Sequence, residues 1–223
     1  LPNGGSALAP WFDIVGYNSD YETLGERGSW NAIGPSNATI AASPLTYYKF
    51  HANEGGLRVP LVISGPGISR QGEMTDEFTF VTDLAPTILS LVGVDDHNGS
   101  WLGREVEPIV GADFSEFLAG VSSPVHAGSV PIGYELGGNS ALFKGDYKIV
   151  INRTGQNESE WHLFNIKTDP GETRDLAQEQ PALLAEMQAD YESYVQANNV
   201  LPMPEGYNRS GRILGDALRQ LRQ

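Results

Sequence analysis

Residues 141–151 read Ala-Leu-Phe-Lys-Gly-Asp-Tyr-Lys-Ile-Val-Ile. The apolar and β-branched residues of this stretch are typical of strands, and Lys144-Gly145-Asp146 between them indicates a turn. Ile132 to Leu136 before it and Trp161 to Lys167 after it are predicted as further strands. After Pro181, apolar residues recur at helical spacing on one face: Leu183, Leu184, Met187, Tyr191, Tyr194 and Val195. The pattern predicts a small antiparallel sheet with a helix laid over it, an α+β unit.

A second pattern lies upstream, where residues 58–64 read Arg-Val-Pro-Leu-Val-Ile-Ser before a Gly-Pro-Gly turn. This short apolar run predicts a buried strand. Thr82 or Asp83 then provides the N-cap of a helix that has Pro86 in its first turn and Gly93 at its end. A strand followed by a helix favours the edge of a large mixed sheet. The predicted fold class is therefore α/β to α+β.

The segment before that strand, residues 18–44, is rich in Gly, Ser, Asn and Pro and has no sustained apolar period. It is predicted to be irregular. A structureless run of this length is uncommon inside a compact domain. We therefore expect it to cover another part of a larger protein.

Composition limits the partners that the chain can take. Its 223 residues carry 28 acidic and 14 basic side chains, a net charge of −14, so we expect no nucleic-acid partner. No stretch approaches the roughly 20 apolar residues that span a bilayer, so no membrane partner is expected either. The first ten residues lack the features of a signal peptide, so one was removed or the chain begins in mid-protein. A periplasmic or secreted location is favoured over a cytoplasmic one.

Residues 49–60 read Lys-Phe-His-Ala-Asn-Glu-Gly-Gly-Leu-Arg-Val-Pro. Together with residues 80–93 and 161–177 they resemble the sulfatase family, within the alkaline-phosphatase-like superfamily, and bacterial arylsulfatases in particular. Residues 49–60 are similar to the family's pattern of a lysine, four residues and then Glu-Gly-Gly-x-Arg-x-Pro. Residues 80–93 are similar to its Asp-[aliphatic]-x-Pro-Thr-[aliphatic]-Leu-x-x-x-Gly helix. Residues 161–177 are similar to its Leu-Tyr-Asn/Asp-Leu…Asp-Pro-x-Glu…Asn/Asp-Leu-Ala segment. The three motifs occur in the family's order, and the resemblance covers roughly residues 20–200.

The resemblance implies that the complete protein is a calcium-dependent hydrolase of sulfate monoesters whose reactive residue is a formylglycine. It identifies this chain with the C-terminal portion of such an enzyme. Residues 1–130 would belong to the catalytic α/β domain, residues 131–200 would form a small antiparallel-sheet subdomain with its helix, and residues 201–223 would be a tail. The family's Cys/Ser-x-Pro-x-Arg signature is absent from the sequence, which has no cysteine. We therefore expect neither cofactor in this chain, and no activity from the chain alone.

By position in the first motif, Lys49 is the catalytic and substrate-binding residue that the resemblance assigns to this chain. A lysine suits the role because its ammonium is a compact charge with three donors that stays protonated at neutral pH. Gly55 and Gly56 are expected to permit a close backbone approach that a Cβ would forbid. Glu54 and Arg58 are expected to form a structural ion pair, with no metal ligand among them. His51, which no family motif uses, is expected to be structural.

The expected partners are a sulfate monoester, the missing N-terminal portion of the same protein, and further copies of this chain. Self-association follows if apolar faces built to meet absent strands are exposed, and a clean monomer in light scattering would contradict it. Two alternatives remain open at this point. One is a phosphoester or phosphonate hydrolase of the same superfamily, and the other is a non-catalytic binding or structural module.

Overall fold

The computed structural model describes residues 16–30, 33–95, 99–121, 124–153 and 158–204. They form two compact units. The first takes its described residues from Leu1–Arg58, Gly133–Leu142 and Tyr147–Gln223, and the second consists of those in Val59–Ile132 and Phe143–Asp146. The predicted division into domains at residues 130 and 200 stays a prediction, because the two units are defined by contacts within this chain and not by the domains of a larger protein.

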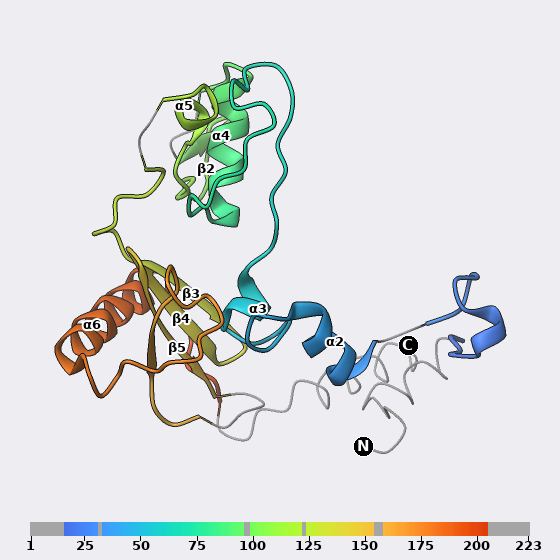
Figure 1. Ribbon diagram of the computed structural model, residues 1–223. Coiled ribbons are helices and arrows are strands. Elements are labelled where there is room, and N and C mark those ends of the chain that lie inside the picture. The colour runs from blue at the N-terminus through green and yellow to red at the C-terminus, as the bar shows by residue number, and fades with distance from the viewer. Residues whose placement is uncertain (1–15, 31–32, 96–98, 122–123, 154–157, 205–223) are drawn as a thin grey trace. The chain divides into compact units, whose positions relative to one another are not determined.

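A four-stranded sheet forms the centre of the first unit (Figure 1). Its strands follow chain order, β3(Ile132–Leu136), β4(Asn139–Lys144), β5(Tyr147–Asn152) and β6(His162–Asn165). The register of β5 and β6 is antiparallel, with Tyr147 opposite Asn165 and Val150 opposite His162. Gly137 and Gly138 both have positive φ, as the tight turn between β3 and β4 requires. The predicted strands are confirmed, although β4 begins two residues earlier than expected and β6 is shorter.

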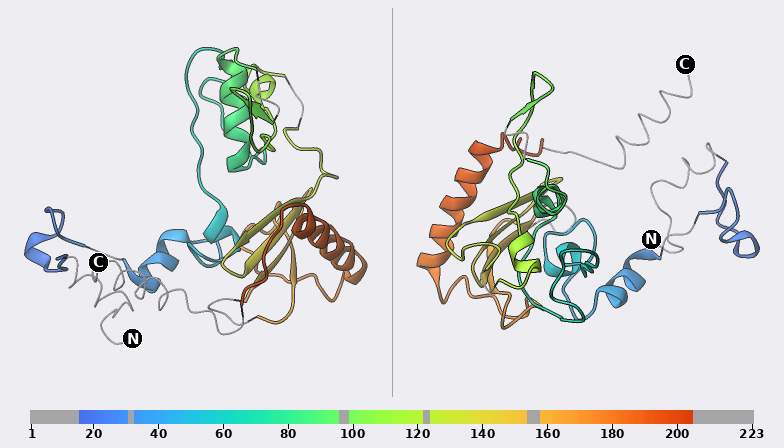
Figure 2. Two further views of the ribbon diagram at one scale, coloured as in Figure 1. Left: turned by 180° about the vertical axis from the view of Figure 1, so that it is seen from behind. Right: turned by 90° about the horizontal axis from the view of Figure 1, so that it is seen from above.

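Helix α6(Pro181–Ala197) lies along one face of this sheet, as two further views show (Figure 2). Met187 and Tyr191 of the helix form a buried core with one residue from each of three strands, Leu142, Ile149 and Leu163. Proline occupies the first turn of α6, where its missing N–H costs nothing. The predicted sheet with its C-terminal helix is confirmed, and with it the fold class.

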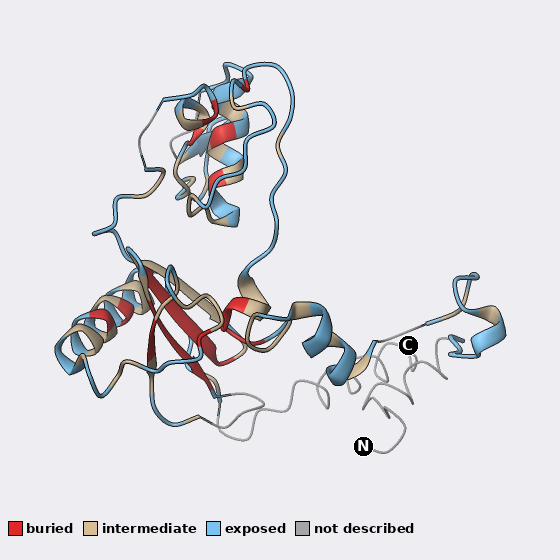
Figure 3. Ribbon diagram, in the orientation of Figure 1, coloured by how far each residue is buried: buried red, intermediate tan, exposed pale blue. Residues whose placement is uncertain are grey.

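The two faces of strand β5 differ in chemistry because successive side chains alternate across a sheet. Tyr147 and Ile149 pack into the core beneath α6. Lys148 and Asn152, which are fully buried, lie on the opposite face. That face is covered by the turn that joins α2(Gly34–Ala42) to α3(Glu54–Leu57) and by the start of α3. Buried residues lie in the strands and at α3, whereas no residue of α2 is buried (Figure 3).

Two sequence predictions about the upstream segments are wrong. Residues 58–64 form no strand, and Val59 and Val62 are 77% and 91% exposed. In the part of the chain that the structure describes, the only sheets are the four-stranded one and the hairpin of β1(Ser100–Trp101) and β2(Arg104–Glu105), and neither offers this run a partner. The segment 18–44 is not wholly irregular, since it contains η1(Tyr21–Thr23) and α2, which starts at Gly34-Pro35.

The second unit is built around α4(Leu84–Leu91), which follows the short turn η2(Val81–Asp83). Its small core consists of Ile68, Phe114 and Leu118, the last of these in α5(Ser115–Leu118). Asp83 precedes α4 and Gly93 follows it with φ 70°, as the sequence predicts. Among the described helices, none has the length and apolar character that a bilayer crossing would need.

Candidate functional site

Lys49 lies in the turn that joins α2 to α3. Its side chain is exposed, and its Nζ is 5.2 Å from the centroid of the Phe50 ring, close enough for a cation–π contact. Phe50 and Tyr47 both have positive φ, 82° and 61°, a conformation that costs free energy for residues with a Cβ. The Lys49 side chain therefore extends into solvent from a turn in which two residues keep unfavourable positive φ angles.

Gly55 and Gly56 allow α3 to pack directly on the backbone of this turn. A Cβ on Gly55 would lie 2.2 Å from the Tyr47 carbonyl oxygen, and one on Gly56 would lie 2.1 Å from that of His51. The Gly55 N–H also donates to the Thr46 carbonyl at 3.0 Å. The predicted close approach is confirmed. The two glycines lie in a short helix, however, and not in a turn that leads into a strand.

His51 is a packing residue of the turn. Its ring stacks on Tyr47 with 4.7 Å between centroids, and its Nδ1 lies 3.0 Å from the Tyr48 carbonyl oxygen. The side chain is buried, whereas that of Lys49 is exposed, so the two do not share an open face. This arrangement agrees with the structural role expected from the sequence.

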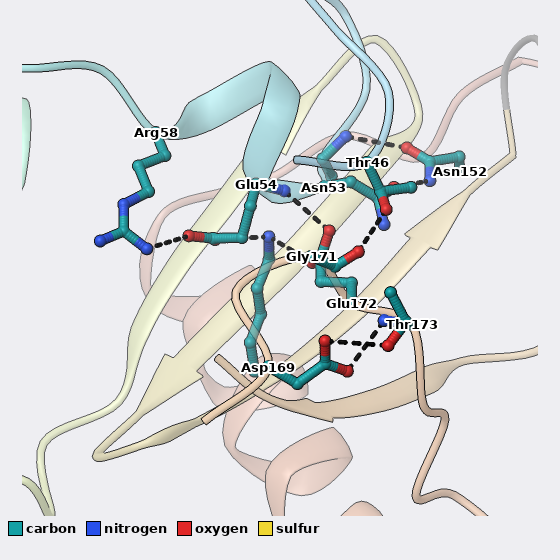
Figure 4. A network of polar contacts seen from close by, with 11 residues as sticks. Thr46, Asn53, Glu54, Arg58, Asn152, Asp169, Gly171, Glu172 and Thr173 are labelled. Atoms are coloured by element: carbon teal, nitrogen blue, oxygen red, sulfur yellow. Dashed lines mark hydrogen bonds and ion pairs between the residues drawn. The ribbon is translucent and has the colours of Figure 1, made fainter. Parts of the chain in front are cut away.

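Beneath the turn lies a buried cluster of one ammonium and two carboxylates. Lys148 of β5 donates to the Oε1 atoms of both Glu54 and Glu172, each at 2.9 Å. The other oxygen of Glu172 accepts the Glu54 backbone N–H at 2.9 Å, so the side chain caps the start of α3 (Figure 4). Lys148 has no exposed surface and the carboxylates almost none. Such burial of charge is tolerated because each group has a partner of opposite sign.

Further polar contacts join the turn to the same face of the sheet and to the loop after β6. The Asn152 side chain accepts the Ala52 N–H at 2.8 Å and donates to the Asn53 side chain at 2.6 Å. The side-chain amide of Asn139 donates to the Phe50 carbonyl at 2.7 Å. The Thr46 hydroxyl donates to the Gly171 carbonyl (Figure 4). The backbone on both sides of Lys49 is therefore fixed.

The sequence predicted Glu54 correctly as a structural residue but named the wrong principal partner. Arg58 lies 3.9 Å from Glu54, and its side chain is half exposed. Lys148 is closer and fully buried. The signal that could have found it is a single lysine inside the apolar run Tyr-Lys-Ile-Val-Ile of residues 147–151. A lysine is almost never buried unless paired, so a carboxylate partner was implied.

The other charged clusters of the sequence serve turns and caps where the structure describes them. Asp83 of the second unit accepts N–H groups of Phe80 and Ala112 and lies 2.7 Å from the His126 ring nitrogen. Asp169 accepts the backbone N–H groups of Thr173 and Arg174. Within the described ranges no three His, Asp or Glu side chains come together as metal ligands would. Asp96 and His97 lie outside the described residues.

A family model for sulfatases matches residues 20–94 of this chain. An uncharacterized sulfatase of Schizosaccharomyces pombe is 31% identical over 192 residues, which are 86% of this chain and 34% of that protein. An arylsulfatase of Klebsiella aerogenes is 33% identical over 100 residues, 44% of this chain and 21% of that protein. The chain thus spans about a third or less of the length of these curated relatives.

A solved structure supports the fold. The crystal structure of Ps i-CgsB in complex with k-i-k-neocarrahexaose superposes with a TM-score of 0.58 and 24% sequence identity. The superposition covers 80% of this chain and 36% of that one. The two-unit chain therefore adopts a fold found as part of a larger protein.

Proposed function

We propose that this chain is the C-terminal portion of a sulfatase, and that its Lys49 binds the sulfate group of a sulfuric ester and stabilises the transition state for its hydrolysis. The turn around Lys49 would then form one wall of the substrate pocket. The observation that carries the proposal is that the motif lysine has an exposed side chain on a turn whose neighbouring residues are bonded to the sheet and to the loop after β6.

The chemistry follows from the charge of the substrate. A sulfate ester presents oxygens that gain negative charge as the ester bond breaks, and a fixed cation stabilises that state more than the ground state. Because the backbone around Lys49 is fixed, only its side chain has to adjust as the transition state forms. Lys49 supplies the cation and the clamped turn supplies its position.

Calcium and formylglycine enter only as expectations for the complete enzyme. The residues of this chain do not fit them, since the sequence has neither a cysteine nor a serine in the Cys/Ser-x-Pro-x-Arg signature, and the described residues gather no metal-ligand group. We derive no step through either group. The portion of the protein that carries them would be the partner that completes the pocket beside Lys49.

The test uses an enzyme that contains this chain and cleaves an aryl sulfate. Lys49→Ala should lower kcat/KM by about 10²–10³-fold, the scale of losing one preorganised charge stabiliser. Lys49→Arg should restore part of the activity, because the charge returns with a different shape. Lys167→Ala, which removes another exposed lysine, is the matched control and should leave the kinetics unchanged. Full activity of Lys49→Ala would refute the proposed role.

A further inference from the structure

We propose that Lys148 and Glu172 are positioning residues that set the location of the Lys49 ammonium through the buried ion cluster beneath its turn. This inference rests on the role proposed for Lys49. Neither residue contacts Lys49. Their effect passes from Glu54 through α3 to the backbone of the turn.

The path is continuous in hydrogen bonds. Lys148 holds the Glu54 carboxylate, and Glu172 holds the Glu54 backbone N–H, so both ends of that residue are fixed. Glu54 begins α3, and the next residue, Gly55, donates to the Thr46 carbonyl. Thr46 is three residues from Lys49. A movement of the Glu54 backbone is therefore transmitted to the turn. Because Gly55 has no Cβ, the backbone of α3 packs closely against the carbonyl groups of Thr46 and Tyr47.

The charges make the cluster cooperative. An ammonium has three donors and no acceptor, and here it serves two carboxylates at equal distance. Without Lys148 the two carboxylates would be buried in each other's vicinity, an arrangement that repels and cannot be hydrated in place. The Glu54 and Glu172 side chains would separate, and the start of α3 would move with them. The three side chains therefore keep their positions only while all three charges are present.

The turn itself explains why such a device is present. Tyr47 and Phe50 adopt positive φ, and strained backbone persists only where the surroundings over-determine it. Asn139 fixes the Phe50 carbonyl, and Asn152 fixes the Ala52 N–H. The ion cluster fixes the remaining side, at Glu54. Lys49 lies between these attachment points.

The first experiment measures amide hydrogen exchange in the 223-residue chain and needs no activity. Lys148→Met and Glu172→Gln should each speed exchange at Ala52, Glu54 and Gly55 by at least tenfold. Exchange in the β5–β6 ladder and in α6, on the other face of the sheet, should change less than twofold. Arg58→Ala is the matched control, because it also removes a charge beside Glu54 but an exposed one. It should leave the turn protected.

Two results would overturn the inference. One is unchanged protection of the turn in a folded Lys148→Met or Glu172→Gln variant. The other is an equal acceleration throughout the sheet and α6, which would make the cluster a general stabiliser of the unit. Glu172→Gln keeps the side-chain shape and an oxygen for the Glu54 N–H, so it serves if Lys148→Met does not fold.

The second experiment is a double-mutant cycle in an enzyme that contains this chain. Lys148→Met should lower kcat for an aryl sulfate at least tenfold with a smaller change in KM. In the Lys49→Ala background it should cause less than a twofold further loss, because a positioning residue has nothing left to position. Additive losses would overturn the inference. Full activity of Lys49→Ala would instead refute the proposed function, while the exchange experiment would still decide whether the cluster fixes the turn.

Discussion

At the scale of single residues, the candidate site depends on one exposed cation and one buried cation. The sequence motif identified Lys49, Glu54 and the two glycines, because their spacing is local. Lys148 lies 94 positions from Glu54, and no local pattern connects them. Only the period-2 alternation of β5 places Lys148 on the face that meets Glu54, and that face depends on which side α6 covers.

A small residue is essential at position 55. Gly55→Ala should destabilise the chain by about 1–3 kcal/mol or more, because the new methyl group would overlap the backbone oxygens of Tyr47 and Thr46, which cannot rotate away. Urea unfolding measures the loss. The control is Gly128→Ala, whose Cβ would have its nearest neighbour at 3.6 Å and should be nearly neutral. Equal stability of the two variants would contradict the prediction, because it would show that the turn backbone moves to make room for the methyl group.

Asp175 should make the first unit sensitive to acid. Burial alone would raise the pKa of its carboxyl, but the N–H groups of Leu163 and Ala177 and the His162 ring bond to the ionised form and lower the pKa below 3.8. A lowered pKa in the folded state means that the stabilisation is present above about pH 3.8 and is lost as the pH falls through the lower, folded-state value.

Asp175→Asn should therefore reduce the fall in stability as the pH drops below 4. It should also be less stable than the parent at pH 6, where the parent carboxylate is ionised. Thermal unfolding of both proteins between pH 6 and pH 2 tests this. Parallel stability curves over that range would contradict the expectation.

At the scale of elements, the sheet and α6 were predictable and the run 58–64 was not. The strands and α6 meet partners that follow closely in the sequence, so their patterns decide their structure. Residues 58–64 have the composition of a strand, but a strand needs a neighbour for its backbone N–H and C=O groups. For residues 58–64, the lack of a neighbouring strand outweighed the β-propensity of the side chains.

The contact between α6 and the sheet should dominate the stability of the first unit. Met187 is fully buried among Leu142, Ile149 and Leu163, so Met187→Ala should cost about 2–5 kcal/mol, from lost burial and the cavity left behind. Gln196→Ala on the exposed side of the same helix should change the stability by less than about 0.5 kcal/mol. Chemical denaturation followed by circular dichroism compares the two. A loss below 1 kcal/mol for Met187→Ala would contradict the packing described.

At the scale of the whole molecule, the chain holds a candidate substrate-binding cation but no residue that matches the family's nucleophile signature. We therefore predict that the pure 223-residue chain does not hydrolyse an aryl sulfate. Release of the phenol from such a substrate, followed by absorbance, measures the activity. The Lys49→Ala variant serves as the control, since any rate that it shares with the parent does not come from the proposed site. Turnover that Lys49→Ala abolishes would refute the prediction.

The hydrogen bond between Glu172 and the start of α3 connects two sequence motifs 118 positions apart. Recombination between related enzymes is therefore constrained in this region. A chimera that exchanges only the C-terminal sheet and the loop after β6 would bring a foreign Lys148 and Glu172 beneath a native Glu54. One that also exchanges residues 46–58 would take all three residues from the same parent. Natural crossovers and designed libraries should tolerate the second kind more readily than the first.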